Sequence, residues 1–358
     1  MSARRIAFLL PHFRVGGAER VVLNWIVALD RARWCPMLLL GKVDGALLHE
    51  LPGDVPVVAL GGGRALRRPR RIARALEANR ADVAYSATSA MNLALLAAPT
   101  KVPRIVSEHT MPEAFRREAK WPLARQVATR MLLPRAAAVA VPTAAIGAAV
   151  RGAPARVLRN PVLSDVPPPL SPKGDGTRIV AAGRLVPAKG FDTLIDAAAL
   201  LAARGVRFSL DIHGEGPLHE ALLAQIGRHR LGDKVRLAGR SDALSAALAA
   251  ADLVVSSSRR EGFGNVIVEA MAVGTPVLAT RAGGPETFVE DGHNGFLVEP
   301  EEPAALAMAI AALLADPARR LSVREAARAT AARYTVAASL AEFTALLGDV
   351  LARNIGRP

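Results

Sequence analysis

The chain has 358 residues, of which 51% are hydrophobic and 22% are charged, and its formal net charge is +14. This is the composition of a globular protein, and the length predicts two domains of ordinary size. The single cysteine, Cys35, excludes an internal disulfide and favours a reducing compartment. The apolar run near the N-terminus ends at Pro11, which is too short for a signal peptide, and no apolar stretch is long enough to span a membrane. We therefore expect a cytoplasmic protein.

Arginine supplies most of the positive charge and is concentrated in two segments of the first half of the chain. One interpretation is a solvated basic face. A nucleic-acid partner is disfavoured, because no DNA- or RNA-binding motif and no interleaved aromatic residues accompany the charge. Peripheral contact with an anionic membrane is the third interpretation, and it gains weight if the substrate is a lipid. The clusters consist of Arg64, Arg67, Arg68, Arg70, Arg71, Arg74 and Arg80, and of Arg116, Arg117, Lys120, Arg125 and Arg130.

Short apolar runs alternate with helical patterns along the whole chain, which predicts parallel-sheet α/β structure. In the first half the expected strands are Ile6–Leu10, Met37–Leu40, Val57–Leu60, Val83–Ser86, Ile105–Glu108 and Ala138–Val141. In the second half they are Ile179–Ala182, Phe208–His213, Val235–Leu237, Leu253–Ser256, Val277–Ala279 and Phe296–Val298. A proline- and glycine-rich stretch, residues 166–177, reads as a linker. We expect two Rossmann-like, doubly wound domains, residues 1–165 and 178–336, facing a central cleft, followed by a helix over 337–358.

Glycines follow the first expected strand of each half. Gly16 and Gly17 precede a helix and let the backbone approach a ligand there, although a tight strand-to-helix turn is the alternative. Arg184 and Lys189 are expected in the N-terminal turn of the next domain's first helix. Cations at that end oppose the helix dipole unless an anion lies between them, so the pair predicts a diphosphate clamp. A solvated pair is the alternative.

The segment from residue 260 to 272 places Glu261 in a glycine-broken loop and Glu269 eight residues later. A helix starting near Gly264 offers free backbone N–H groups to a phosphate, between two carboxylates that accept hydroxyl hydrogens. This pattern fits a nucleotide sugar, while a capped core helix with two incidental glutamates is the alternative. Arg240 follows another strand and is placed to meet a nucleobase.

Several ordered motifs resemble family 4 of the retaining glycosyltransferases, over nearly the whole chain. They are Gly16-Gly-Ala-Glu-Arg20, Gly183-Arg184 with Lys189-Gly190, Glu261 with seven residues to Glu269, Gly274-Thr-Pro-Val-Leu-Ala-Thr280, Gly283-Gly-Pro-Glu286 and Asp291-Gly-His-Asn-Gly-Phe296. The resemblance implies the two-domain B-type glycosyltransferase (GT-B) architecture. The N-terminal domain would take the acceptor, the C-terminal domain would hold the nucleotide sugar, and the final helix would pack back on the first domain.

The resemblance also implies the roles of single residues. Arg184 and Lys189 would hold the donor diphosphate and stabilise it as it leaves. Glu261 would bind donor-sugar hydroxyls, and Glu269 would bind the ribose. Two further sets are implied: catalytic His109, beside the donor sugar or alternatively structural, and the phosphate- or sugar-binding backbone of Gly16, Gly17, Phe263, Gly264 and Asn265.

Arginine, lysine and helix N-termini can neutralise a leaving diphosphate, so we expect no metal and no cofactor. The sequence also contains no Asp-x-Asp motif and no clustered histidine or cysteine ligands. The favoured activity moves a UDP-hexose or UDP-N-acetylhexosamine sugar to a cell-surface or lipid-linked glycan. A GDP-mannose donor, a sugar-nucleotide epimerase and a non-catalytic binding module are the alternatives.

Overall fold

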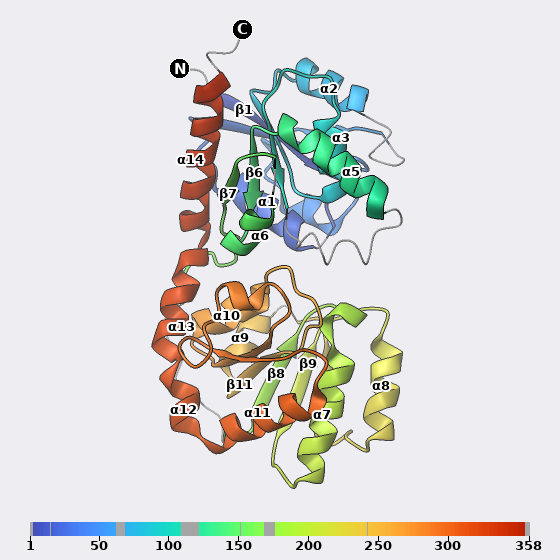
Figure 1. The fold of residues 1–358 in the computed structure, drawn as a ribbon, viewed down its shortest axis with the longest axis vertical. Helices are drawn as coiled ribbons and strands as arrows, with labels where there is room; N and C mark the ends of the chain where they lie inside the picture. Colours follow the sequence, from blue (N-terminus) through green and yellow to red (C-terminus); the bar gives the residue numbers. More distant parts are fainter. Residues whose placement is uncertain are drawn as a thin grey trace. The chain divides into compact units, whose positions relative to one another are not determined.

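The computed structural model describes residues 3–14, 16–61, 69–108, 122–150, 152–167, 176–241 and 243–354. The chain divides into two compact units: the first is Met1–Ser164 with Thr335–Pro358, and the second is Asp165–Tyr334. Each unit is a parallel sheet covered by helices on both faces (Figure 1). The expected fold class, two doubly wound α/β domains, is confirmed.

The first unit contains a seven-stranded parallel sheet of order β3-β2-β1-β4-β5-β6-β7. Side chains of the interior strand β1 alternate between two cores: Ile6, Phe8 and Leu10 lie in one, and Ala7 and Leu9 lie in the other. Such a strand is buried on both faces, as expected for a parallel sheet. The strands are β1 (Arg4–Leu10), β2 (Trp34–Leu40), β3 (Val57–Ala59), β4 (Val83–Ser86), β5 (Arg104–Ser107), β6 (Ala138–Val141) and β7 (Ala155–Val157). The sequence pattern did not predict β7, because this three-residue edge strand is largely exposed and has no apolar run.

Helices of the first unit pack on both faces of its sheet. Helices α1 (Gly17–Ala28) and α14 (Val336–Asn354) cover one face. Helices α2 (Pro69–Ala78), α3 (Ser89–Leu96) and α6 (Ala144–Ala149) cover the other. The remaining helical segments are α5 (Pro122–Leu132), η1 (Ala46–Glu50) and η3 (Leu133–Arg135).

The second unit contains a six-stranded parallel sheet of order β10-β9-β8-β11-β12-β13. Every strand expected in this half is present. The strands are β8 (Arg178–Ala182), β9 (Ser209–His213), β10 (Val235–Gly239), β11 (Leu253–Ser256), β12 (Val277–Thr280) and β13 (Phe296–Val298). Strand order reverses between β8 and β11, because the chain runs from β8 to β9 on one side and from β11 to β12 on the other. Ligands of doubly wound sheets bind at the carboxyl ends of strands at such a point.

Helices α7, α8 and α11 cover one face of the second sheet, and α9 and α10 lie on the other (Figure 1). Their bounds are α7 (Phe191–Ala203), α8 (His219–Arg228), α9 (Leu244–Ala249), α10 (Asn265–Val273) and α11 (Pro303–Ala315). The chain then continues through α12 (Pro317–Ser322), α13 (Arg324–Ala331) and η6 (Ala332–Tyr334), and the short turns η4 (Pro187–Lys189) and η5 (Pro285–Thr287) lie in loops.

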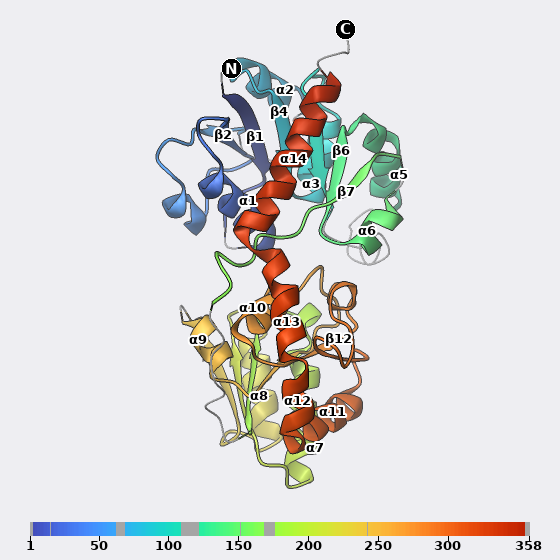
Figure 2. The same ribbon diagram turned by 90° about the vertical axis from the view of Figure 1, so that its left-hand side faces the viewer.

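The C-terminal helix α14 is anchored in the core of the first unit (Figure 2). The ring of Phe343 stacks on Trp25 of α1 with centroids 4.3 Å apart and planes at 4°. Tyr85 meets both rings edge-on, and the indole N–H of Trp25 donates to Ser339 Oγ at 2.9 Å. The last helix in the chain thus completes a core begun by the first strands. No helix among the described residues is both long and apolar enough to cross a membrane.

Replacing Phe343 with alanine is expected to lower the free energy of unfolding of the first unit by about 3–5 kcal/mol, because a fully buried ring is lost. All three tryptophans lie within residues 1–164, so tryptophan fluorescence during urea unfolding reports on this unit. The control Val27→Ala alters an exposed side chain of α1 and should change the free energy by less than about 0.5 kcal/mol. Equal effects of the two variants would contradict the anchoring of α14.

Candidate functional site

The loop after β8 carries Lys189 and is shaped by Gly190. Residues 187–189 form the turn η4, and Gly190 ends it with φ of 61°, a left-handed conformation that favours glycine. A Cβ at this position would lie 2.2 Å from the carbonyl oxygen of Ser257. The loop after β8 therefore packs directly on the loop after β11, and only glycine allows that approach.

The close approach brings Lys189 and Glu261 together. The ammonium group of Lys189 donates to Glu261 Oε2, and Ser258 Oγ lies 3.4 Å from the same oxygen. The two side chains are 26% and 15% exposed, so both retain access to solvent. The backbone N–H of Glu261 donates to Ala282 O at 2.9 Å, which ties this loop to the end of β12 as well. A cation and a carboxylate thus meet at the strand-order reversal between β8 and β11.

Arg184 does not take part in this ion pair. Its side chain is exposed and has no hydrogen bond or ion pair within the part of the chain that the structure describes. The expectation that Arg184 and Lys189 lie in the first turn of a helix is wrong, since α7 begins only at Phe191. The first turn of α7 instead carries Asp192, whose charge suits the helix dipole. Both cations lie in the loop before the helix.

Helix α10 begins where the sequence predicts. Gly264 is its N-cap with φ of 101°, and a Cβ there would lie 3.5 Å from Glu261 Cγ. The N-terminal N–H groups of α10, starting at Asn265, therefore lie next to Glu261. Phe263 turns its ring inward, where it packs on Phe288 at 4.8 Å between centroids. Only the backbone of Phe263 is left to meet a ligand.

Glu269 lies in the middle of α10 and is partly buried. Burial raises the pKa of its carboxyl above the ordinary value of 4.5. No hydrogen bond or ion pair to this carboxylate occurs among the described residues. A carboxylate held in a poorly solvated position without a partner is suited to accept hydroxyl hydrogens from a ligand.

Arg240 is exposed and lies just after β10. Among the described residues, no hydrogen bond or ion pair joins it to Lys189 or Glu261. Its neighbour Gly239 accepts the backbone N–H of Gly214 at 2.8 Å, so the turns after β10 and β9 lie side by side. The structure places Arg240 on the same edge of the sheet as the pair, two strands from β8.

In the first unit, Gly16 is the N-cap of α1 and Gly17 is its first residue. A Cβ on Gly16 would lie 2.4 Å from Glu19 Oε2, because the buried Glu19 carboxylate folds back over the helix start. Glu19 was not among the site residues expected from the sequence. An acidic residue in the first turn was the available signal, since negative charge is stabilised at that end of a helix.

His109 lies outside the described residues. The chain just before it is held by Asn92 of α3, which is 2% exposed. The Asn92 amide donates to Ser107 O at 2.8 Å and to Glu108 Oε1 at 2.9 Å. Ser86 Oγ donates in turn to Asn92 Oδ1 at 2.7 Å. A buried polar network thus joins the carboxyl ends of β4 and β5.

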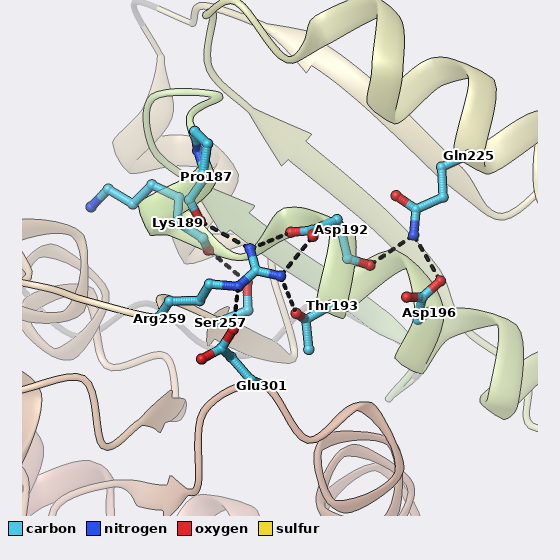
Figure 3. Close-up of polar contacts among 9 residues, drawn as sticks. All are labelled: Pro187, Lys189, Asp192, Thr193, Asp196, Gln225, Ser257, Arg259 and Glu301. Carbon is cyan, nitrogen blue, oxygen red and sulfur yellow. Dashed lines mark hydrogen bonds and ion pairs between the residues drawn. The ribbon is translucent and has the colours of Figure 1, made fainter. Parts of the chain in front are cut away.

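Arg259 is a second residue that was not expected at the site from the sequence. Its guanidinium lies between α7, η4 and the loop after β13, where it contacts Asp192 and Glu301 (Figure 3). Its position beside Arg260 in a basic dipeptide was the only signal, and many surface arginines share it. Among the described residues, no group of three or more histidine, cysteine, aspartate or glutamate side chains is arranged to hold a metal ion.

Two family profiles together match the chain from residue 15 to residue 330. The profile described as "Glycosyltransferase Family 4" matches residues 15–165, and that described as "Glycosyl transferases group 1" matches residues 166–330. The chain belongs to the group 1 glycosyltransferases of family 4. The resemblance inferred from the glycine and glutamate motifs is therefore confirmed.

Similar proteins agree with this family. The lipopolysaccharide core biosynthesis glycosyltransferase LpsE of Rhizobium meliloti is 38% identical over 156 residues, which cover 44% of this chain and 45% of LpsE. This chain thus spans about half the length of the curated relatives that it matches. Anabaena HepE in complex with UDP has a TM-score of 0.82 at 26% identity, covering 96% of this chain and 100% of HepE. Sucrose-phosphate synthase from Thermosynechococcus elongatus shares the GT-B fold, with a TM-score of 0.81 at 20% identity over 98% of this chain and 100% of the synthase.

The burial of Glu269 has a consequence for stability. Because its folded-state pKa is raised, the native state binds the proton more tightly than the unfolded state. Stability therefore falls as the pH rises from the ordinary glutamate pKa to the raised one, and the penalty persists above it. Glu269→Gln is expected to stabilise the second unit at about pH 8 and to have a smaller effect at about pH 4.

Hydrogen exchange of the α10 amides at the two pH values measures this effect in the second unit alone. The matched control is Glu220→Gln, which alters an exposed glutamate on α8. Glu269→Gln protein that exchanges faster than wild type at about pH 8 would show that the carboxylate is stabilising instead.

Proposed function

We propose that the protein transfers a sugar, with retention of anomeric configuration, from a nucleoside diphosphate sugar to an acceptor hydroxyl. The observation that carries the proposal is the Lys189–Glu261 pair beside the N-terminus of α10. It brings a cation, a carboxylate and the first N–H groups of α10 to the strand-order reversal of the second sheet. The cation and the N–H groups can bind a diphosphate, and the carboxylate can accept hydrogen bonds from sugar hydroxyls.

Each residue of this edge has a proposed task. Lys189 and Arg184 neutralise the negative charge that grows on the diphosphate as the glycosidic bond breaks. Because Arg184 has no other partner among the described residues, its guanidinium is available for a bidentate phosphate contact. The first N–H groups of α10 add to this charge stabilisation, so the proposed mechanism requires no metal. Glu261 binds sugar hydroxyls, and it is not assigned as a covalent nucleophile.

Glu269 is proposed to accept hydrogen bonds from the ribose. Its raised pKa reflects lost solvation, and ribose hydroxyls would return the hydrogen bonds that water supplies elsewhere. The roles of Gly16, Gly17 and His109 remain expectations drawn from the family resemblance. They concern the first unit, whereas donor binding is proposed from residues of the second unit.

The donor is proposed to be a UDP-sugar, a hexose or an N-acetylhexosamine. HepE, 25–26% identical to this chain, has crystal structures in complex with UDP and with UDP-glucose. In this chain the turn at Arg240, on the same edge of the sheet, is proposed to contact the base. GDP-mannose is the alternative donor. An epimerase would turn over donor without an acceptor, and a binding module would not turn it over at all.

The acceptor is proposed to be a cell-surface or lipid-linked glycan. LpsE is a lipopolysaccharide core biosynthesis enzyme by name, which supports this class of acceptor. We propose a cytoplasmic protein that touches the membrane through the basic segments of the first unit. In the described part of those segments, α2 buries Ile72 and Leu76 and exposes Arg70, Arg71 and Arg74. A helix with one anchored apolar face and an exposed basic face suits an anionic lipid surface.

A nucleotide panel tests the function. UDP at about 100 times its dissociation constant is expected to raise the stability of the second unit by about 2.7 kcal/mol, seen as a thermal shift that GDP and ADP do not produce. Lys189→Ala should reduce the shift, whereas Lys234→Ala, which alters a surface lysine paired with its neighbour Asp233, should preserve it. A shift with GDP alone would point to GDP-mannose. Equal shifts in both variants would remove Lys189 from the site.

Vesicle binding tests the membrane contact. Replacing Arg70 and Arg71 with glutamine is expected to weaken binding to anionic phosphatidylglycerol vesicles about 30-fold, since each of the two basic residues near such a surface contributes about 1 kcal/mol. Co-sedimentation measures the effect, with Arg228→Gln/Arg333→Gln as a charge-matched control in exposed positions of the second unit. Identical vesicle binding by the two double variants would contradict the proposed membrane contact.

A further inference from the structure

The guanidinium of Arg259 uses every hydrogen-bond donor that it has (Figure 3). Nη1 donates to Pro187 O at 2.9 Å and to Asp192 Oδ1 at 2.7 Å. Nη2 donates to Asp192 Oδ2 at 2.6 Å and to Thr193 Oγ1 at 3.1 Å. Nε donates to Glu301 Oε1 at 3.0 Å. Five N–H groups thus meet five acceptors, the full capacity of this side chain.

The acceptors come from two separate stretches of chain: the continuous segment formed by the turn η4 and the first turn of α7, and the loop after β13. The backbone adds to this attachment. The N–H groups of Arg259 and Arg260 both donate to Ala188 O, at 2.9 and 3.2 Å. Ser257 Oγ donates to Lys189 O at 3.1 Å. The loop after β11 therefore holds the carbonyl groups of residues 187, 188 and 189 in succession.

These contacts are made by the same two loops that carry Lys189 and Glu261. Pro187 is two residues before Lys189, and Arg259 is two residues before Glu261. Fixing Arg259 to Pro187 therefore fixes the two backbones from which the pair projects. The network continues away from the pair, because Gln225 Nε2 donates to the backbone carbonyl of Asp192 at 3.0 Å.

Arg259 is itself unsuited to bind the diphosphate. Its charge is compensated by the carboxylates of Asp192 and Glu301, 2.6 and 3.0 Å away. The hydrogen bond to Asp192 raises the pKa of Arg259 further, so the guanidinium stays charged and engaged. Burial alone would raise the pKa of Asp192, but the hydrogen bond and charge of Arg259 outweigh it and lower that pKa.

We propose that Arg259 is a positioning residue for the donor site: it locks η4 and the loop after β11 together so that Lys189 and Glu261 face the same donor. The inference rests on the function proposed above. A lysine cannot replace Arg259, because a single ammonium cannot hold two carboxylates, a hydroxyl and a carbonyl in one plane. The guanidinium fork, and not the charge alone, is what the site requires.

The test compares Arg259→Ala and Arg259→Lys with Arg236→Ala, which removes an exposed arginine that pairs with Asp211 on the same sheet. Calorimetry with UDP and turnover of UDP-glucose are the readouts. Hydrogen-bond partners that orient metal-binding side chains typically contribute about 10- to 100-fold to affinity or activity, and we expect the same range for Arg259. We expect both Arg259 variants to lose UDP affinity and donor kcat/KM by about that factor, with no rescue by lysine, while Arg236→Ala resembles wild type.

A double variant separates positioning from general damage. If Arg259 acts through Asp192, the Arg259→Ala/Asp192→Ala protein should bind UDP no more weakly than Arg259→Ala alone, since coupled residues are not additive. Additive losses, full rescue by lysine, or wild-type affinity in Arg259→Ala would each overturn the proposal. Should Arg259→Ala fail to fold, Thr193→Val removes a single acceptor, and unchanged UDP affinity in that variant would overturn the proposal as well.

Nucleotide binding by the wild-type protein distinguishes a failure of the proposed function from a failure of the positioning role alone. If wild type binds none of UDP, GDP and ADP, the proposed function fails, and this inference fails with it. If wild type binds UDP and the Arg259 variants bind it equally well, the function stands and only the positioning role is lost.

Discussion

The proposed donor site depends on the contact between two loops, one after β8 and one after β11. The left-handed Gly190 lies against the carbonyl of Ser257, at a distance that leaves no room for a Cβ. Parallel strands leave such loops on one edge of the sheet, and the reversal of strand order between β8 and β11 makes them neighbours. Lys189, Glu261 and the start of α10 meet because these loops are held together.

The three cations at this edge of the sheet differ in their partners and in their exposure to solvent. Arg259 is fully engaged by Asp192 and Glu301 and holds structure in place. Lys189 pairs with the partly exposed carboxylate of Glu261, and a diphosphate can compete with this carboxylate for the ammonium group. Arg184 is exposed and has no partner among the described residues. A structural cation and a proposed binding cation, Arg259 and Lys189, therefore lie on two loops that are in contact, although the two residues are far apart in the sequence.

Much of this was readable from the sequence. Alternating apolar runs and helical patterns predicted the α/β class, and the glycine before Asn265 predicted the start of α10. The family resemblance implied that the last helix returns to the first domain, but its tertiary partners were not readable. Phe343 stacks on Trp25, and these two residues are separated by most of the chain. The network of Arg259 likewise joins two stretches of chain, residues 187–193 and the loop after β13, that are far from Arg259 in the sequence. The first turn of α7 was misjudged because Asp192, not a cation, occupies it.

The central claim is that Lys189 binds the phosphate nearest the sugar. Calorimetric titration of wild type and Lys189→Ala with UDP and with UMP tests it most directly, since the two ligands differ by that phosphate. A charge-assisted hydrogen bond contributes about 1.5–3 kcal/mol, so the ratio of UDP to UMP affinity should fall by about tenfold or more in Lys189→Ala. An unchanged ratio would contradict the account.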